Sequence, residues 1–153
     1  SFVQVSLNRY KAEICEAPWS ISRVPVKYWK DKHNQLKFFN WLGKKLSLKS
    51  LDDWYNVKTA DVINNGGRGL LSIHKGSLPA ALKSVYTEHD WIYWKFPTVP
   101  HSFWNNKSNR VRCVQWIQQE LDIHSLDDWY HVQQKQVEGL RGATGLIRGC
   151  GSL

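Results

Sequence analysis

Apolar residues recur at helical spacing along the chain, and the same spacing occurs twice. In residues 34–46 (NQLKFFNWLGKKL), the residues that fall near one helical face are Leu36, Phe39, Trp41, Leu42 and Leu46. Residues 109–121 repeat these intervals with Val111, Val114, Trp116, Ile117 and Leu121. Such spacing is typical of an amphipathic helix packed on a core. Asn34 and Asn109 suit the N-cap position, so the pattern predicts one capped helix in each region.

A short acidic motif follows each predicted helix. The sequence SLDDWY occupies residues 50–55 and again residues 125–130. A serine at the N-cap with an acidic residue three positions later is the arrangement of a capping box, and acidic residues in a first turn suit the helix dipole. We therefore interpret Asp53 and Asp128 as helix caps.

The two motifs belong to a longer internal repeat. When the chain is laid over itself with the two SLDDWY motifs in register, Trp19 aligns with Trp94, Val24-Pro25 with Val99-Pro100, Trp29 with Trp104, Asn34 with Asn109, and Trp41 with Trp116. The match weakens after Val57 and Val132, then resumes with a one-residue shift near Gly69 and Gly145. It predicts a degenerate tail of a preceding copy in residues 1–18, a first repeat in 19–93 and a truncated second repeat in 94–153.

The remaining patterns are also helical. TADVINNGG (59–67) suits a short helix that ends at two glycines, and GSLPAALKSVY (76–86) suits a helix with Ser77 as cap. No alternating strand pattern stands out. The sequence predicts an all-α tandem repeat of about 75 residues, built from short helices joined by Gly/Pro turns and packed on a shared Trp-rich core.

Tryptophan supports that expectation. There are nine in 153 residues, and large aromatic side chains usually enter a core or an interface. The positions that recur between the copies, and that we expect in the core, are Trp19/Trp94, Trp29/Trp104, Trp41/Trp116 and Trp54/Trp129. Truncation of Trp54 or of Trp129 is then expected to cost roughly 3–5 kcal/mol. Trp91, Tyr28 and Tyr93 are the aromatics expected at the surface.

The charge adds a functional expectation. The formal net charge is +8, and residues 23–49 alone hold eight Lys and Arg against Asp31. A basic helical surface interleaved with aromatics is typical of a protein that contacts phosphate backbones, although a solvated helix face explains much of such charge equally well. The candidate nucleic-acid-binding residues are Arg23, Lys27, Lys30, Lys32, Lys37, Lys44, Lys45, Lys49, Arg68, Lys75 and Lys83.

Two other functions stay open. Asp52, Asp53, Asp127 and Asp128 would be the ligands of a metal-dependent nuclease, but adjacent helical residues point about 100° apart and do not converge on one ion. A protein–protein interaction scaffold would instead use the exposed aromatics, with the charge aiding solubility. Capping remains the favoured role of the acidic pairs.

Other catalytic signals are missing from the sequence. The glycine-rich NNGGRGLL (64–71) lacks phosphate-loop spacing, the histidines do not pair at metal-ligand spacing, and no serine or cysteine nucleophile motif is present. We expect no catalytic residue, no metal and no cofactor. Cys15, Cys113 and Cys150 form no CxxC pair, which favours a reducing, intracellular setting, and no apolar run of the sequence is long enough to indicate a membrane span.

Two resemblances extend this interpretation. Residues 59–91, with a short helix, a glycine turn and a "GS…AL" helix, resemble helix-turn-helix-like repeats found beside homing endonucleases. The wider pattern DDWY, GG.GLL, GS..AL..VY.EH.W and VP..(F/Y)W resembles a tandem-repeat family of eukaryotic microbes and plants, which implies no particular activity. The second copy departs from the pattern by reading GATGLIRGC at residues 142–150.

Together these features predict a non-enzymatic, intracellular module, nuclear or organellar, that binds nucleic acid, DNA rather than RNA, without contacting a membrane. The two copies are expected to differ in that role. Lys37, Lys44 and Lys45 of the first predicted helix correspond to Arg112, Gln119 and Glu120 of the second. The local charge therefore falls from +3 to 0 between them, and binding through this helix is expected to be asymmetric.

Overall fold

The structure is a computed structural model that describes residues 17–20 and 22–150. Those residues form α-helices, 3₁₀ turns and one π-type turn without any β-strand, so the predicted all-α class is confirmed. The predicted tail of a preceding repeat falls almost wholly on residues 1–16, outside the described residues. In the described ranges, every helix is too short or too polar to cross a membrane.

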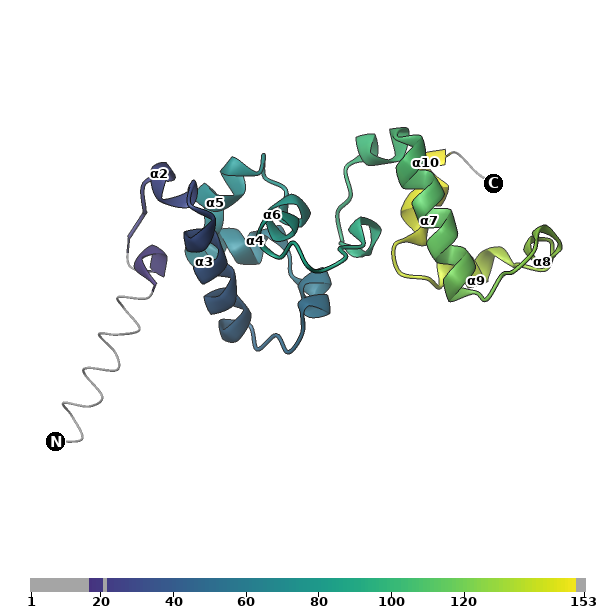
Figure 1. The fold of residues 1–153 in the computed structure, drawn as a ribbon, viewed down its shortest axis with the longest axis horizontal. Helices are drawn as coiled ribbons and strands as arrows, with labels where there is room; N and C mark the ends of the chain where they lie inside the picture. The colour runs from purple at the N-terminus through teal and green to yellow at the C-terminus, as the bar shows by residue number, and fades with distance from the viewer. Residues whose placement is uncertain (1–16, 21, 151–153) are drawn as a thin grey trace. The chain divides into compact units, whose positions relative to one another are not determined.

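The chain divides into two compact units between Trp91 and Ile92. In the first unit (Figure 1), the elements in chain order are η1 (Pro18–Ser20), α2 (Val26–Trp29), α3 (Lys32–Lys45), η2 (Leu51–Asn56), α4 (Thr59–Val62), η3 (Ile63–Gly67), α5 (Arg68–Ile73) and α6 (Leu78–Val85). In the second unit they are η4 (Tyr93–Lys95), η5 (His101–Asn105), α7 (Lys107–Glu120), α8 (Leu126–Trp129), α9 (Gln134–Glu138) and α10 (Ala143–Cys150).

The two long helices begin earlier than the sequence predicted. Asp31 caps α3, with its Oδ1 accepting from the backbone N–H of His33 at 2.8 Å, and Asn106 caps α7 in the same way through Ser108 at 2.9 Å. The expected caps, Asn34 and Asn109, lie inside the first turn. Their side-chain amides reach back to the carbonyls of residues six positions earlier, Tyr28 and Phe103, each at 2.9 Å. The asparagines therefore tie each helix to the turn before it.

An aromatic cluster lies at the centre of the first unit. Trp19 packs edge-on against Phe38 with ring centroids 5.3 Å apart, and Trp29 does the same at 5.4 Å. Phe39 meets Trp54 at 5.4 Å, which connects the cluster to η2. Trp41, at the edge, is half-buried rather than buried. The side chains of α3 that are buried are Gln35, Phe38, Phe39 and Leu42.

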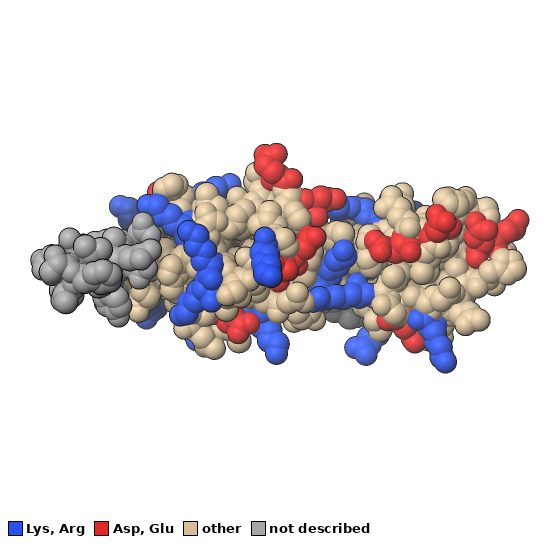
Figure 2. Space-filling model, turned by 90° about the horizontal axis from the view of Figure 1, so that it is seen from below, with Lys and Arg blue, Asp and Glu red and all other residues tan. Residues whose placement is uncertain are grey.

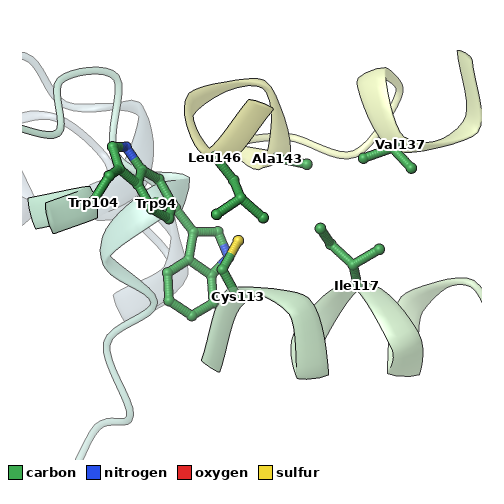
Figure 3. Packing of buried hydrophobic residues seen from close by; sticks show 7 residues of the cluster. All are labelled: Trp94, Trp104, Cys113, Ile117, Val137, Ala143 and Leu146. Atoms are coloured by element: carbon green, nitrogen blue, oxygen red, sulfur yellow. The ribbon is translucent and has the colours of Figure 1, made fainter. Parts of the chain in front are cut away.

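The second unit has a smaller core, drawn in Figure 3. Cys113 and Ile117 of α7 face Ala143 and Leu146 of α10 and Val137 of α9, and Trp94 and Trp104 close one end. The sequence expectation for α7 was partly wrong. Val111 and Val114 were expected on the core face, yet both are exposed, and the interior position is taken by Cys113. Trp116 and Trp129 are half-buried.

Both SLDDWY motifs form the predicted caps. The Oδ2 of Asp53 accepts from the backbone N–H groups of Lys49 at 2.6 Å and Ser50 at 3.0 Å. Asp128 repeats the pattern with His124 at 2.9 Å and Ser125 at 2.8 Å. These backbone hydrogen bonds hold the pKa of both carboxyl groups below the usual value. The second carboxylate of each motif thus has a structural role in its unit.

One aromatic expected at the surface is buried. Trp91 is only 3% exposed, its ring lies 5.8 Å from that of Tyr55, and its indole N–H donates to the carbonyl of Tyr86 at 3.1 Å. The segment after α6 folds back over η2, which the sequence pattern does not reveal. Tyr28 and Tyr93 are half-buried.

Candidate nucleic-acid interface

The basic residues selected from the sequence all lie at the surface of the first unit. Each of the eleven is exposed. They come from the segment before α2 (Arg23), from α2 and its end (Lys27, Lys30), from α3 (Lys32, Lys37, Lys44, Lys45), from the approach to η2 (Lys49), and from α5, the turn after it and α6 (Arg68, Lys75, Lys83). Exposure leaves every one of them accessible to a ligand.

The lysines of α3 do not form a single row. Lys37 and Lys44 are seven residues apart and so lie on one side of the helix, opposite the buried residues. Lys45 turns away, and its Nζ lies 5.1 Å from the ring centroid of Trp41. Figure 2 shows lysine and arginine side chains scattered over one face, with acidic and neutral side chains between them. The lysines therefore supply a diffuse positive potential rather than a defined site.

Both predicted arginines line one cleft of about 760 Å³ in the first unit. Arg23 and Arg68 contribute to its lining together with Trp19, Trp29, Val24, Val26, Gly66, Gly69 and three serines. The cleft is open to solvent, with apolar walls and two guanidinium groups that can form bidentate hydrogen bonds to an anion. Sequence reasoning selected both arginines but did not predict that they share a cleft.

Glycines bring the walls of this cleft together. Gly66 has a φ of +94°, and a β-carbon there would lie 2.7 Å from the carbonyl oxygen of Trp19. At Gly69 a β-carbon would lie 2.7 Å from the indole of Trp29. The sequence NNGGRG therefore lets η3 and the first turn of α5 approach the two tryptophans closely. The glycines permit this close contact because they have no side chain.

A hydrogen-bond network supports the tryptophan wall from behind. The side-chain amide of Gln35, buried inside the unit, donates to the carbonyl of Trp29 at 2.6 Å, and His74 Nε2 lies 2.9 Å from the Gln35 oxygen. Burial, and secondarily the charge of Lys32, lowers the pKa of His74 below its usual value. The neutral imidazole can donate from Nε2 to the Gln35 oxygen, which fixes the amide.

A second cleft, of about 410 Å³, lies in the second unit. Its walls include Trp94, Trp104, Val99, Gly142 and Gly145, and its basic residues are Lys95, Arg141 and Arg148. Gly142 has a φ of +96° and packs against the carbonyl oxygen of Trp94. Arg110 takes the place of Gln35 behind this wall, because its Nη1 donates to the carbonyl of Trp104 at 2.6 Å.

The two clefts share their apolar and glycine lining but not their arginines. In the register of the SLDDWY motifs, Trp19, Val24 and Trp29 align with Trp94, Val99 and Trp104. After the one-residue shift in the alignment, Gly66 and Gly69 align with Gly142 and Gly145. In these registers Arg23 and Arg68 correspond to Thr98 and Thr144, whereas Arg141 and Arg148 correspond to Asn65 and Ser72. Each cleft thus carries two arginines that come from different positions. The recurring Trp and Gly spacing was the sequence signal that could have located both sites.

The acidic residues show no comparable convergence. In each SLDDWY motif the second carboxylate is engaged with backbone N–H groups, as described above, and Asp52 Oδ1 lies 3.3 Å from His89 Nε2. Among the described residues, no three His, Cys, Asp or Glu side chains gather closely enough to hold a metal ion. The described geometry thus gives the nuclease hypothesis no supporting feature.

Comparison of the chain with protein-family models, with curated proteins and with solved structures found no match.

Proposed function

We propose that the protein is a nucleic-acid-binding module made of two copies of one helical unit, and that each copy holds the sugar–phosphate backbone at its Trp- and Arg-lined cleft. The observation that carries this proposal is the recurrence of two arginines at both clefts although none of the four occupies an equivalent position. Positive charge retained at one place through different residues is more simply explained by an anionic ligand than by solubility.

The chemistry of the clefts suits a phosphodiester. Arginine presents a planar fork of N–H donors that matches two phosphate oxygens, and it is less strongly hydrated than lysine. The tryptophan rings are almost fully buried, so they serve as walls and offer little surface for stacking on bases.

The lysines of α2 and α3 have a secondary role in this proposal. The positive charge is only partly kept at the equivalent positions of α7, where Lys107 and Arg112 stand for Lys32 and Lys37 but Gln119 and Glu120 stand for Lys44 and Lys45. Exposed lysines of this kind contribute sequence-independent, salt-sensitive attraction and position the ligand without selecting bases. Replacement of Lys37, Lys44 and Lys45 by Gln is expected to reduce the slope of log K against log salt by up to about 3. Replacement of Arg112 alone is expected to change it little.

The wider expectations follow from this function. Residues 59–91 would belong to the helix-turn-helix-like class that they resemble, with duplex DNA as the preferred ligand, and the wider motif pattern would place the chain in the tandem-repeat family described above. A DNA-binding role requires a compartment that holds DNA, the nucleus or an organelle. The proposed activity involves no catalytic step, metal or cofactor.

A fluorescence anisotropy titration tests the proposal. The full chain is added to labelled duplex DNA, single-stranded DNA and RNA at a low and a high salt concentration. We expect saturable binding at low salt, tightest for duplex DNA, that weakens steeply as salt rises. Absence of binding to all three ligands at low salt would rule the proposal out, and tighter binding of RNA would overturn the preference for DNA.

A scaffold for protein partners is the second candidate, and one observation favours it. Leu126 and Tyr130 of the second unit are 81% and 87% exposed, which is unusual for a leucine and a tyrosine one helical turn apart. Apolar exposure of this kind is typical of an interaction surface.

A further inference from the structure

Helix α7 carries one continuous polar row on its outer side. Side chains spaced alternately by four and three residues lie one above another on a helix, because each residue turns the chain by about 100°. Four exposed side chains of α7 follow this spacing, namely Ser108, Arg112, Gln115 and Gln119. Cys113 and Ile117 project from the other side of the helix toward α10 (Figure 3). The row therefore faces away from the core of the second unit.

The corresponding row of α3 is exposed as well. In the register of the SLDDWY motifs it consists of His33, Lys37, Asn40 and Lys44, and each of these side chains is exposed although α6 packs against α3. Asn40 stays exposed even while its side chain accepts a hydrogen bond from the Tyr86 hydroxyl at 2.8 Å. An outward-facing row is thus a property of the long helix in both units.

The side chains of the α7 row are of the kinds that recognise base edges. Arginine can form two hydrogen bonds to guanine, glutamine can form two to adenine, and serine can donate or accept. The acidic residue of α7, Glu120, lies outside the row. Where α3 has Lys37 and Lys44, α7 has Arg112 and Gln119. A glutamine amide attracts phosphate less than a lysine does, but it places a donor beside an acceptor, as an adenine edge requires.

The row lies beside the second cleft. Lys95 lines that cleft, and its Nζ lies 5.7 Å from the ring centroid of Trp116. Trp116 belongs to α7 and is four residues after Arg112 and three before Gln119, so it is a neighbour of both on the helix surface. A DNA backbone held at the cleft would therefore run close to the row.

We propose that α7 enters the major groove of duplex DNA and reads base edges through Arg112, Gln115 and Gln119. This inference rests on the proposed function, because the cleft must hold the backbone while the row reads the bases. From Ser108 to Gln119 the helix rises about 17 Å, the length of about five base pairs. The major groove is about 12 Å wide and admits one helix. We expect a preferred site with one guanine and two adenines within about five successive base pairs.

Selection from duplexes with a randomised centre tests this inference. The full chain is mixed with the pool, and the bound duplexes are recovered and sequenced. We expect the wild type to enrich a common site that contains guanine and adenine. Arg112→Ala should reduce the preference for guanine by a factor of about five or more, and Gln115→Ala with Gln119→Ala should reduce the preference for adenine similarly. Alanine favours helix, so the exposed positions should tolerate these changes.

Gln134→Ala is the matched control, because Gln134 is an exposed glutamine of α9 in the same unit. This variant should enrich the same site as the wild type. Duplex binding without a common sequence would overturn the inference and leave the proposed function standing. Row variants that still select the wild-type site would also overturn it. Absence of any duplex binding would overturn both the inference and the proposed function.

Discussion

Gly66 packs directly against the carbonyl oxygen of Trp19, at a φ of +94° and with space for no side chain between them. Gly66→Ala should therefore destabilise the first unit by more than about 2 kcal/mol, because a left-handed conformation and a steric clash both oppose alanine. Urea unfolding followed by circular dichroism measures the loss.

Gly76→Ala is the matched control for that substitution. Gly76 also has a positive φ, +78°, but a β-carbon there meets nothing within 4 Å. Its replacement should cost only the conformational penalty, about 1 kcal/mol. Equal losses at the two positions would show that the approach of the glycine turn to Trp19 is not what positions the cleft wall.

The two SLDDWY tryptophans should differ in their contribution to stability. Trp54 is 2% exposed and packs against Phe39, so Trp54→Ala should cost roughly 3–5 kcal/mol. Trp129 is only half-buried, so Trp129→Ala should cost clearly less, contrary to the equal losses that the sequence alone suggested. Urea unfolding of the two variants compares them, and a Trp129→Ala loss as large as that of Trp54→Ala would contradict the exposed setting of α8.

The caps should make the protein sensitive to acid. Asp53 and Asp128 have lowered pKa values in the folded chain, so their stabilising effect is complete above the unfolded value and is lost as pH falls through the folded value. The double variant Asp53→Asn, Asp128→Asn should lose less thermal stability on acidification than the wild type.

Asp127→Asn alone provides the comparison, since Asp127 is adjacent to Asp128 and equal in charge, whereas Asp52 lies 3.3 Å from His89 Nε2. This variant should keep the acid sensitivity of the wild type, as measured by the melting temperature between neutral and acidic pH. If acid sensitivity were lost in the comparison variant and kept in the Asp53/Asp128 variant, the assignment of the caps to Asp53 and Asp128 would be wrong.

His74 should add a separate pH dependence near neutrality. Its folded pKa lies below the usual value of about 6.5, so the neutral ring stabilises the fold fully above that value and progressively less as the pH falls below it. His74→Gln should flatten the fall in melting temperature between about pH 7 and pH 5. A wild-type profile in this variant would exclude His74 as the group responsible.

Local sequence rules predicted the helices and the acidic caps well, because hydrophobic spacing and capping chemistry act within a few residues. The start of α3 was misplaced because Asp31 and Asn34 are both residue types that favour the N-cap position. The hydrogen bond of the Asn34 amide to the carbonyl of Tyr28 decides between them. Val114 shows a different failure. Its spacing is that of a core residue, yet its side chain is exposed, because α7 turns Cys113 to the interior instead.

The clefts depend on contacts between distant segments. Arg23 and Arg68 are far apart in the sequence, and no local pattern indicates that they line one cavity. Trp91 was misplaced for the same reason, since its burial requires the chain to fold back over Tyr55. The recurring Trp and Gly spacing of the two aligned segments is a sequence signal for the clefts, whereas no recurrence in the sequence marks Trp91.

The salt dependence of DNA binding by two charge-matched variants tests the central claim most directly. Arg23→Gln with Arg68→Gln removes the arginines of the first cleft, and Lys58→Gln with Lys135→Gln removes two exposed charges that line neither cleft. We predict that the cleft variant binds duplex DNA more weakly and that its slope of log K against log salt falls by up to about 2, with little change in the comparison variant. Equal affinities and slopes for the two variants would contradict binding of the phosphate backbone at the clefts.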